Sequence, residues 1–149
     1  MKTVLMVIGS FLIFFPLLWS SVVMMISAIS GWMKLGSVYK SDIPMQGKKI
    51  WVGVLSMGFK GFFKSQYNNL VRVSCDRDHL YMGVLLPFRM GHPTLKIPFS
   101  DMAVVDAKPT IWGTKRKTLK TERVPDIEIL LTEKVVKTIE DHFSALAKG

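Results

Sequence analysis

The residues best suited to acid–base chemistry lie between Arg89 and Asp101. Arg89-x-x-His92 is followed by a serine and Asp101, so a guanidinium, an imidazole, a hydroxyl and a carboxylate occur within 13 positions. Hydrolytic sites use such groups, but this spacing matches no known catalytic arrangement, and the chain has no Gly-x-Ser-x-Gly, His-Glu-x-x-His or phosphate-binding glycine-rich motif. We therefore predict a structural motif of Arg89, His92, Pro93 and Asp101, with Arg89 paired to Asp101, and a chain that is not an enzyme.

Metal and redox chemistry are not indicated either. Cys75 is the only cysteine, which excludes an intrachain disulfide and a Cys-x-x-Cys site and fits a reducing compartment. His79 and His142 have no ligand partners at the spacing that metal sites use. No cofactor and no metal ion are expected.

A first candidate for lipid contact lies in residues 58–64, which read Gly-Phe-Lys-Gly-Phe-Phe-Lys. Aromatic side chains in a glycine-relaxed loop could enter the headgroup boundary, and each lysine near anionic lipid contributes about 1 kcal/mol. The candidate contacts are Lys60, Phe62, Phe63 and Lys64. The alternative is that Phe59 and Phe63 belong to the core of an irregular strand or hairpin.

A second candidate is the basic cluster Lys115, Arg116 and Lys117. It could bind the phosphates of an inositol lipid or of nucleic acid, or an acidic patch on a partner, or it could be a solvated hairpin tip. Only Trp112 lies near these charges, whereas base stacking requires interleaved aromatics. We therefore expect no nucleic-acid partner.

The element that would position both candidates is an apolar segment at the start of the chain. From Thr3 to Met33 there is no charged side chain, and this stretch exceeds the roughly 20 residues that cross a bilayer as a helix. The sequence predicts a single transmembrane helix in residues 1–33. A secretory signal cleaved after Ser30 is the alternative, but signal peptides have apolar regions of only about 7 to 15 residues.

Charge predicts the orientation of this helix. The chain carries a net charge of +9, and Lys2 is the only charge before Lys34, so the rest carries 9 − 1 = +8. Basic residues favour the cytoplasmic side, and four follow the span closely: Lys34, Lys40, Lys48 and Lys49. We expect a cell-membrane protein with a linker in residues 34–47 and a cytoplasmic globular domain in residues 48–149.

Within that domain, β-branched and aromatic residues alternate with polar ones in short runs between turn residues. The pattern predicts six or seven antiparallel strands, at residues 49–55, 70–75, 79–86, 94–99, 102–107 and 126–131, with a weaker one near 111–119. A helix is expected from Glu133, with Thr132 as its N-cap. Its apolar stripe comprises Val135, Ile139, Phe143 and Leu146. The fold class is α+β: a β-barrel or sandwich with one C-terminal helix.

This element order resembles the pleckstrin-homology-like (PH-like) superfold, and within it the bacterial PH and GRAM-like modules. The similar residues are Leu80-Tyr81, the stretch 87–93 and the stretch Leu95–Asp101, which contains an Ile-Pro-aromatic-x-Asp step. Met102 stands where such modules more often have isoleucine. The resemblance implies a binding or scaffolding role.

Together these patterns predict a membrane-anchored, non-catalytic module whose partner is anionic lipid headgroups or another membrane protein. An accessory subunit of a larger membrane complex is the second hypothesis. A secreted domain released by signal cleavage is the third.

Overall fold

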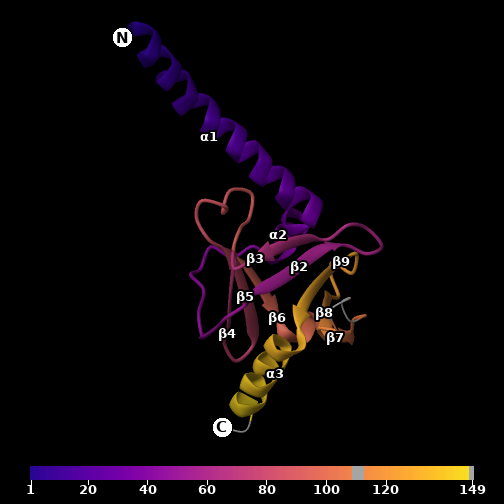
Figure 1. Cartoon of the computed structure of the whole chain (residues 1–149). Coiled ribbons are helices and arrows are strands. Elements are labelled where there is room, and N and C mark those ends of the chain that lie inside the picture. The colour runs from indigo at the N-terminus through magenta and orange to yellow at the C-terminus, as the bar shows by residue number, and fades with distance from the viewer. Residues whose placement is uncertain (109–112, 148–149) are drawn as a thin grey trace.

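The computed structural model describes residues 1–108 and 113–147, the last two of these in backbone only. A long helix leads into a β-rich domain, and a second long helix lies at the opposite end of that domain (Figure 1). Helix α1 (Lys2–Ser30) is 29 residues long and continues through Pro16. Most of its apolar side chains are exposed over the first 18 positions. The predicted helix is present and is long and apolar enough to span a membrane.

A short helix, α2 (Trp32–Tyr39), follows where the sequence suggested a linker. Gly31 separates the two helices with a left-handed backbone (φ 80°), and a Cβ atom there would lie 2.2 Å from Ile127 Cδ1. Trp32, Leu35 and Tyr39 are buried at helical spacings of three and four residues. The sequence did not suggest this helix because its apolar positions were divided between the span and the linker.

Two antiparallel sheets form the domain. The first has the order β1-β4-β5-β6, with β1 at Lys48–Ile50, β4 at Val71–Cys75, β5 at His79–Val84 and β6 at Leu95–Pro98. The second has the order β3-β2-β9-β8-β7, with β3 at Ser65–Asn68, β2 at Val54–Phe59, β9 at Ile127–Thr132, β8 at Arg116–Thr121 and β7 at Met102–Asp106. A 3₁₀ turn, η1 (Phe99–Asp101), joins β6 to β7.

The strand count differs from the prediction of six or seven, because the described residues contain nine strands. The expected strand 49–55 is split near Gly53 into β1 and β2, which pair with different sheets. Strand β3 is mostly polar and has no apolar alternation that could reveal it. Within the described residues the two sheets do not close into a barrel. Residues 111–112 of the weaker expected strand at 111–119 lie outside the described residues.

The core lies between the sheets and is covered by helix α3 (Glu133–Ala147). Helix α3 begins where the sequence predicts, and Val135 and Ile139 of its stripe are buried together with Val136. Phe143 is 44% exposed and contacts Phe99, with 5.2 Å between the ring centroids. The side chain of Leu146 lies outside the described part. The coarse prediction of an α+β chain with antiparallel strands and a closing helix is confirmed.

Trp32 should contribute strongly to stability because it is fully buried at the junction of helix and domain. We expect Trp32→Ala to lower the free energy of unfolding by about 3 to 5 kcal/mol, since it removes a large side chain and leaves a cavity. Trp51→Ala is the matched control because Trp51 is 79% exposed. Denaturant unfolding of the full chain in detergent measures both variants, and equal losses would contradict this packing.

Candidate functional site

The last third of α1 is packed against the domain rather than free. The loop that follows β5 (residues 85–94) lies beside the helix (Figure 1). The rings of Trp19 and Phe88 are 5.1 Å apart, and Ser20 Oγ lies 3.1 Å from Met90 Sδ. Val23 is 2% exposed. The helix and this loop, which we call the docking loop, therefore form one packed unit.

Gly91 allows the docking loop to approach the helix closely. Its φ is +71°, and a Cβ atom there would lie 3.3 Å from Met24 Cα. The Ser27 hydroxyl donates a hydrogen bond to the Gly91 carbonyl. A larger residue would be strained in this conformation and would push the loop away from α1.

A buried polar cluster lies where α1 turns into α2. The Tyr67 hydroxyl from β3 is 2.8 Å from Ser30 Oγ and 3.0 Å from His92 Nε2. Trp32 Nε1 donates to the Pro93 carbonyl at 2.9 Å, and its ring contacts His92 edge-on at 5.3 Å. Each of these hydrogen bonds joins a helix to the domain or the docking loop to a strand. The cluster holds the junction together.

The protonation state of His92 follows from its surroundings. Burial lowers its pKa below the usual 6.5, against hydrogen bonds to the Met90 and Phe88 backbone that raise it. His92 Nδ1 lies 3.0 Å from the Met90 carbonyl, which can only accept, so Nδ1 carries the proton. The Tyr67 hydroxyl, which donates its proton to Ser30 Oγ, lies 3.0 Å from Nε2. This geometry gives His92 a structural role.

The prediction that Arg89 pairs with Asp101 is wrong. Asp101 is bound instead by Arg123, with Nε 2.8 Å from its carboxylate, and the Tyr39 hydroxyl lies 3.3 Å away. Asp101 belongs to the 3₁₀ turn η1, whereas Arg89 is exposed on the docking loop. Of the predicted motif, only His92 and Pro93 are brought together with the cluster.

The predicted lipid contacts in residues 58–64 form the tip of the β2–β3 hairpin. Phe62 and Phe63 are 77% and 81% exposed, so the alternative that placed Phe63 in the core is wrong. Phe59 is partly buried, and its ring lies under Lys34 Nζ at 5.7 Å. Lys60 is exposed.

Lys64 differs from the rest of the hairpin tip because its charge has a partner. Its Nζ lies 3.0 Å from the Glu128 carboxylate, which is also 3.4 Å from Lys120 Nζ. Burial raises the pKa of Glu128, but the two lysines outweigh this and hold it below its usual value. Glu128 therefore stays ionised and positions both lysines on the sheet.

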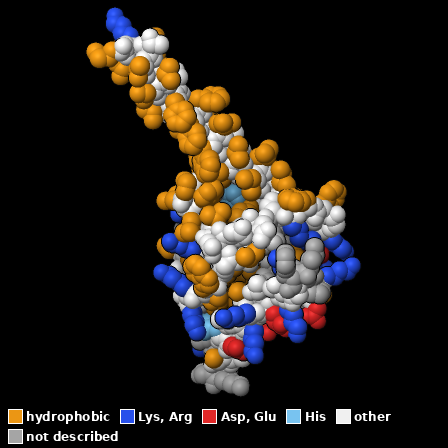
Figure 2. Space-filling view, in the orientation of Figure 1, with side chains coloured by type: hydrophobic (Ala, Val, Ile, Leu, Met, Phe, Trp, Pro, Cys, Tyr) orange, Lys and Arg blue, Asp and Glu red, His pale blue; other side chains and the backbone are white. Residues whose placement is uncertain are grey.

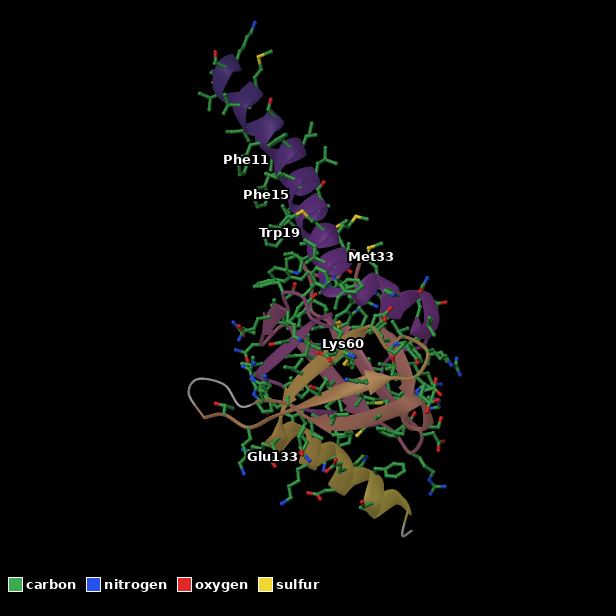
Figure 3. All side chains as sticks on the ribbon, turned by 90° about the vertical axis from the view of Figure 1, so that its right-hand side faces the viewer. Phe11, Phe15, Trp19, Met33, Lys60 and Glu133 are labelled. Carbon is green, nitrogen blue, oxygen red and sulfur yellow. The ribbon has the colours of Figure 1, made fainter. Side chains whose placement is uncertain are left out.

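The basic cluster Lys115, Arg116 and Lys117 lies far from the hairpin tip and from α1. The Lys115 carbonyl accepts the Glu133 backbone N–H at the start of α3. Helix α3 is at the opposite end of the domain from α1 (Figures 1 and 3). The two predicted lipid-binding clusters therefore do not form one surface. Figure 2 shows the corresponding division, with apolar side chains along α1 and lysine and arginine side chains over the domain.

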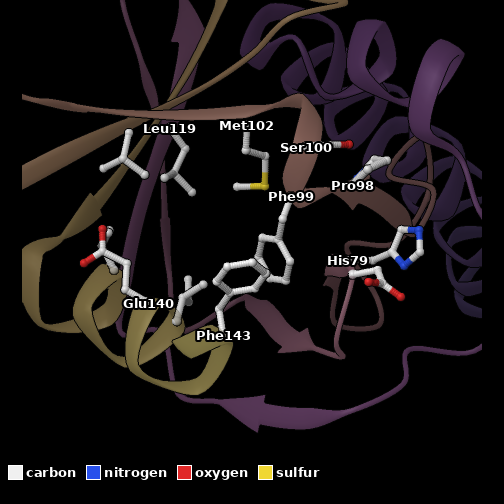
Figure 4. Close-up of a pocket in the computed structure, with 12 residues that line it drawn as sticks. His79, Pro98, Phe99, Ser100, Met102, Leu119, Glu140 and Phe143 are labelled. Atoms are coloured by element: carbon white, nitrogen blue, oxygen red, sulfur yellow. The ribbon is translucent and has the colours of Figure 1, made fainter. Parts of the chain in front are cut away.

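A pocket of about 690 Å³ opens beside α3 (Figure 4). Its wall is mainly apolar and includes Phe99, Met102, Leu119 and Phe143, while polar groups such as Glu140 occur among its lining residues. Such a lining could hold an apolar group. The sequence did not suggest this pocket, because its walls come from segments far apart in the chain.

Comparison with protein-family models, with curated proteins and with solved structures gives no match to this chain. Within residues 1–108 and 113–147, no group of three or more His, Cys, Asp or Glu residues is arranged to hold a metal ion. The features that this part of the chain offers are therefore the docked apolar helix, the exposed aromatic tip, the distal basic cluster and the pocket.

Acid should weaken the junction through His92. Because folding lowers the pKa of His92, the folded state favours the neutral ring. The stabilisation from the neutral ring is fully present above the pKa of His92 in the unfolded chain, near 6.5, and is lost as the pH falls through its lower pKa in the folded state. We expect the denaturation midpoint of the full chain to fall between pH 7.5 and 5. The fall of the midpoint should be smaller in His92→Gln. In the matched variant His142→Gln it should be as large as in the unsubstituted chain. Identical pH profiles for all three proteins would contradict the assignment.

Proposed function

We propose that this chain is a membrane-anchored, non-catalytic binding module. It crosses the cell membrane once through α1 and holds a PH-like domain on the cytoplasmic side. Its partner is the lipid headgroup layer, with the distal surface free for a protein partner. The order of strands and closing helix supports the PH-like assignment, and the excess of lysines after the span supports the orientation.

One observation carries the proposal: α1 has two differently packed parts. From Val4 to Leu18 nearly every side chain is exposed and apolar, whereas Val23, Ser27 and Ser30 are buried against the domain. An apolar face of this extent is costly in water, and a bilayer about 30 Å thick would cover it. The buried part then fixes the domain at the membrane surface.

The same packing argues against signal cleavage after Ser30. Ser30 is fully buried, lies inside α1 and is hydrogen-bonded to Tyr67. Cleavage there would remove Val23 and Ser27 from the core and separate Ser30 from the Trp32 helix. A retained anchor therefore fits the contacts better than a removed signal.

The second candidate function, an accessory subunit of a membrane complex, is favoured by the distal surface. The basic cluster at Lys115–Lys117 and the pocket beside α3 are at the end of the domain opposite α1, where a bilayer crossed by α1 could not reach them. An acidic or apolar segment of a protein in the aqueous phase could reach both the basic cluster and the pocket.

Fractionation tests the anchor. We expect full-length protein in the membrane fraction, resistant to alkaline extraction, because α1 is embedded rather than adsorbed. A single cysteine at Lys134 on the exposed side of α3 (Lys134→Cys) should react with an impermeant maleimide only after the cells are permeabilised. The unmodified protein is the control, since Cys75 is fully buried. A soluble product lacking residues 1–30, or labelling of intact cells, would refute the anchor or its orientation.

Purification in mild detergent separates the two candidate functions. If the chain is a lone module, it should elute as a monomer. A stoichiometric partner that is lost when Lys115 and Lys117 are both changed to Glu, but kept when Lys48 and Lys49 are changed, would establish the subunit role instead.

A further inference from the structure

We propose that the docking loop is itself a membrane-contact element, with Leu86 and Met90 in the hydrocarbon boundary and Arg89 at the lipid phosphates. This inference rests on the proposed function, because it requires α1 to span the bilayer. It names a contact site that differs from the hairpin tip and the basic cluster suggested by the sequence.

The length of α1 sets the depth of the loop. At 1.5 Å per residue, about 20 residues cross a hydrocarbon core of about 30 Å. If the span begins at Thr3, the first uncharged position, it ends near Val22. The loop residues Phe88 and Met90 contact Trp19 and Ser20, which are inside this limit. Tilting the helix lengthens the span and brings the loop deeper.

The aromatic residues of α1 agree with this boundary. Phe11, Phe15 and Trp19 follow one side of the helix (Figure 3), with ring centroids 5.3 and 6.2 Å apart. Phe88 of the docking loop contacts the last of these rings. Tryptophan is enriched at the membrane–water interface, which is where the helix length places Trp19.

The side chains of the loop suit an interface. Leu86 is 79% exposed and Met90 is 50% exposed, although both are apolar, and Met90 lies beside Ser20 of α1. Arg89, between Phe88 and Met90, is exposed as well. A guanidinium binds phosphate oxygens in a bidentate manner, and its aliphatic part can cross apolar surface while the charge stays in the polar layer. The apolar side chains of Leu86 and Met90 therefore suit the edge of the hydrocarbon layer, and Arg89 suits the adjacent phosphate layer.

The hairpin tip is positioned less directly. Phe59 contacts Lys34 of α2, which follows the end of α1, so the tip starts beyond the last residue of the anchor. In the proposed arrangement, a tilt of α1 toward the hairpin brings Phe62 and Phe63 closer to the bilayer. The hairpin contacts α1 at its last residue, through Tyr67 of β3 and Ser30, whereas the docking loop contacts α1 at Trp19 and Ser20 and is therefore closer to the proposed interface.

Spin labelling tests this placement of the docking loop. The full chain carries the labels and is reconstituted into vesicles of phosphatidylcholine with phosphatidylglycerol. The labelled variants are Leu86→Cys in the docking loop, Lys134→Cys on α3 and Leu12→Cys in the span. We expect Leu86→Cys, like Leu12→Cys, to be several-fold more accessible to oxygen than to a water-soluble nickel chelate. Lys134→Cys should show the reverse. The wild-type chain, whose Cys75 is buried, controls for background labelling.

The outcomes separate this inference from the anchor. If the label at residue 12 is oxygen-accessible while the label at residue 86 behaves like that at residue 134, the anchor stands and the loop contact is refuted. If the label at residue 12 is exposed to the nickel chelate, the proposed anchor itself fails.

Arg89→Gln tests the phosphate contact. It should move the label at residue 86 toward the aqueous phase, because the guanidinium no longer binds lipid phosphate. Arg77→Gln is the matched control, since Arg77 is an exposed arginine in the turn at the other end of the β4–β5 hairpin. Equal depth in the two variants would refute the role of Arg89.

Discussion

The packing of the last third of α1 against the docking loop is the constraint on which the rest of the structure depends. Ser27 bonds to the Gly91 carbonyl, and Ser30, Tyr67 and His92 form a buried hydrogen-bonded chain. Because these groups lose solvent on burial, breaking one contact would leave its partner unsatisfied, at a cost of about 1 to 3 kcal/mol. The helix is therefore not a flexible tether, and the domain has a defined position relative to it.

That position gives the domain two distinct ends. Near α1 are the docking loop and, beyond α2, the exposed hairpin tip; at the other end are α3, the pocket and the basic cluster. In the proposed arrangement the first end meets lipid and the second faces the aqueous phase. The net charge of +9 attracts anionic surfaces in general, but in the proposed arrangement only residues near α1 are close to the bilayer.

Sequence patterns predicted the elements that depend on local periodicity. Helix α1 has a continuous run of uncharged residues and α3 has an amphipathic stripe. Strands β4 and β5 are short runs of mainly apolar residues on either side of the turn at residues 76–78. The sequence did not indicate what depends on distant contacts. Helix α2 depends on the packing of Trp32 against Tyr67 of β3 and on contacts with β6. Asp101 pairs with Arg123 rather than with Arg89. The residues around Leu86 and Met90 have no local pattern that distinguishes an exposed loop from the end of a buried strand. The contact of the docking loop with α1 could therefore not be predicted from the sequence.

The most direct test of a rigid junction is a distance measurement between the span and the far end of the domain. Spin labels at Leu12→Cys and Lys134→Cys, both exposed positions, would be measured by pulsed dipolar spectroscopy in nanodiscs. The packing described here predicts one narrow distance distribution, which should broaden when Gly91 is replaced by valine. A broad distribution in the unsubstituted junction would show that α1 is a flexible tether and would contradict the account.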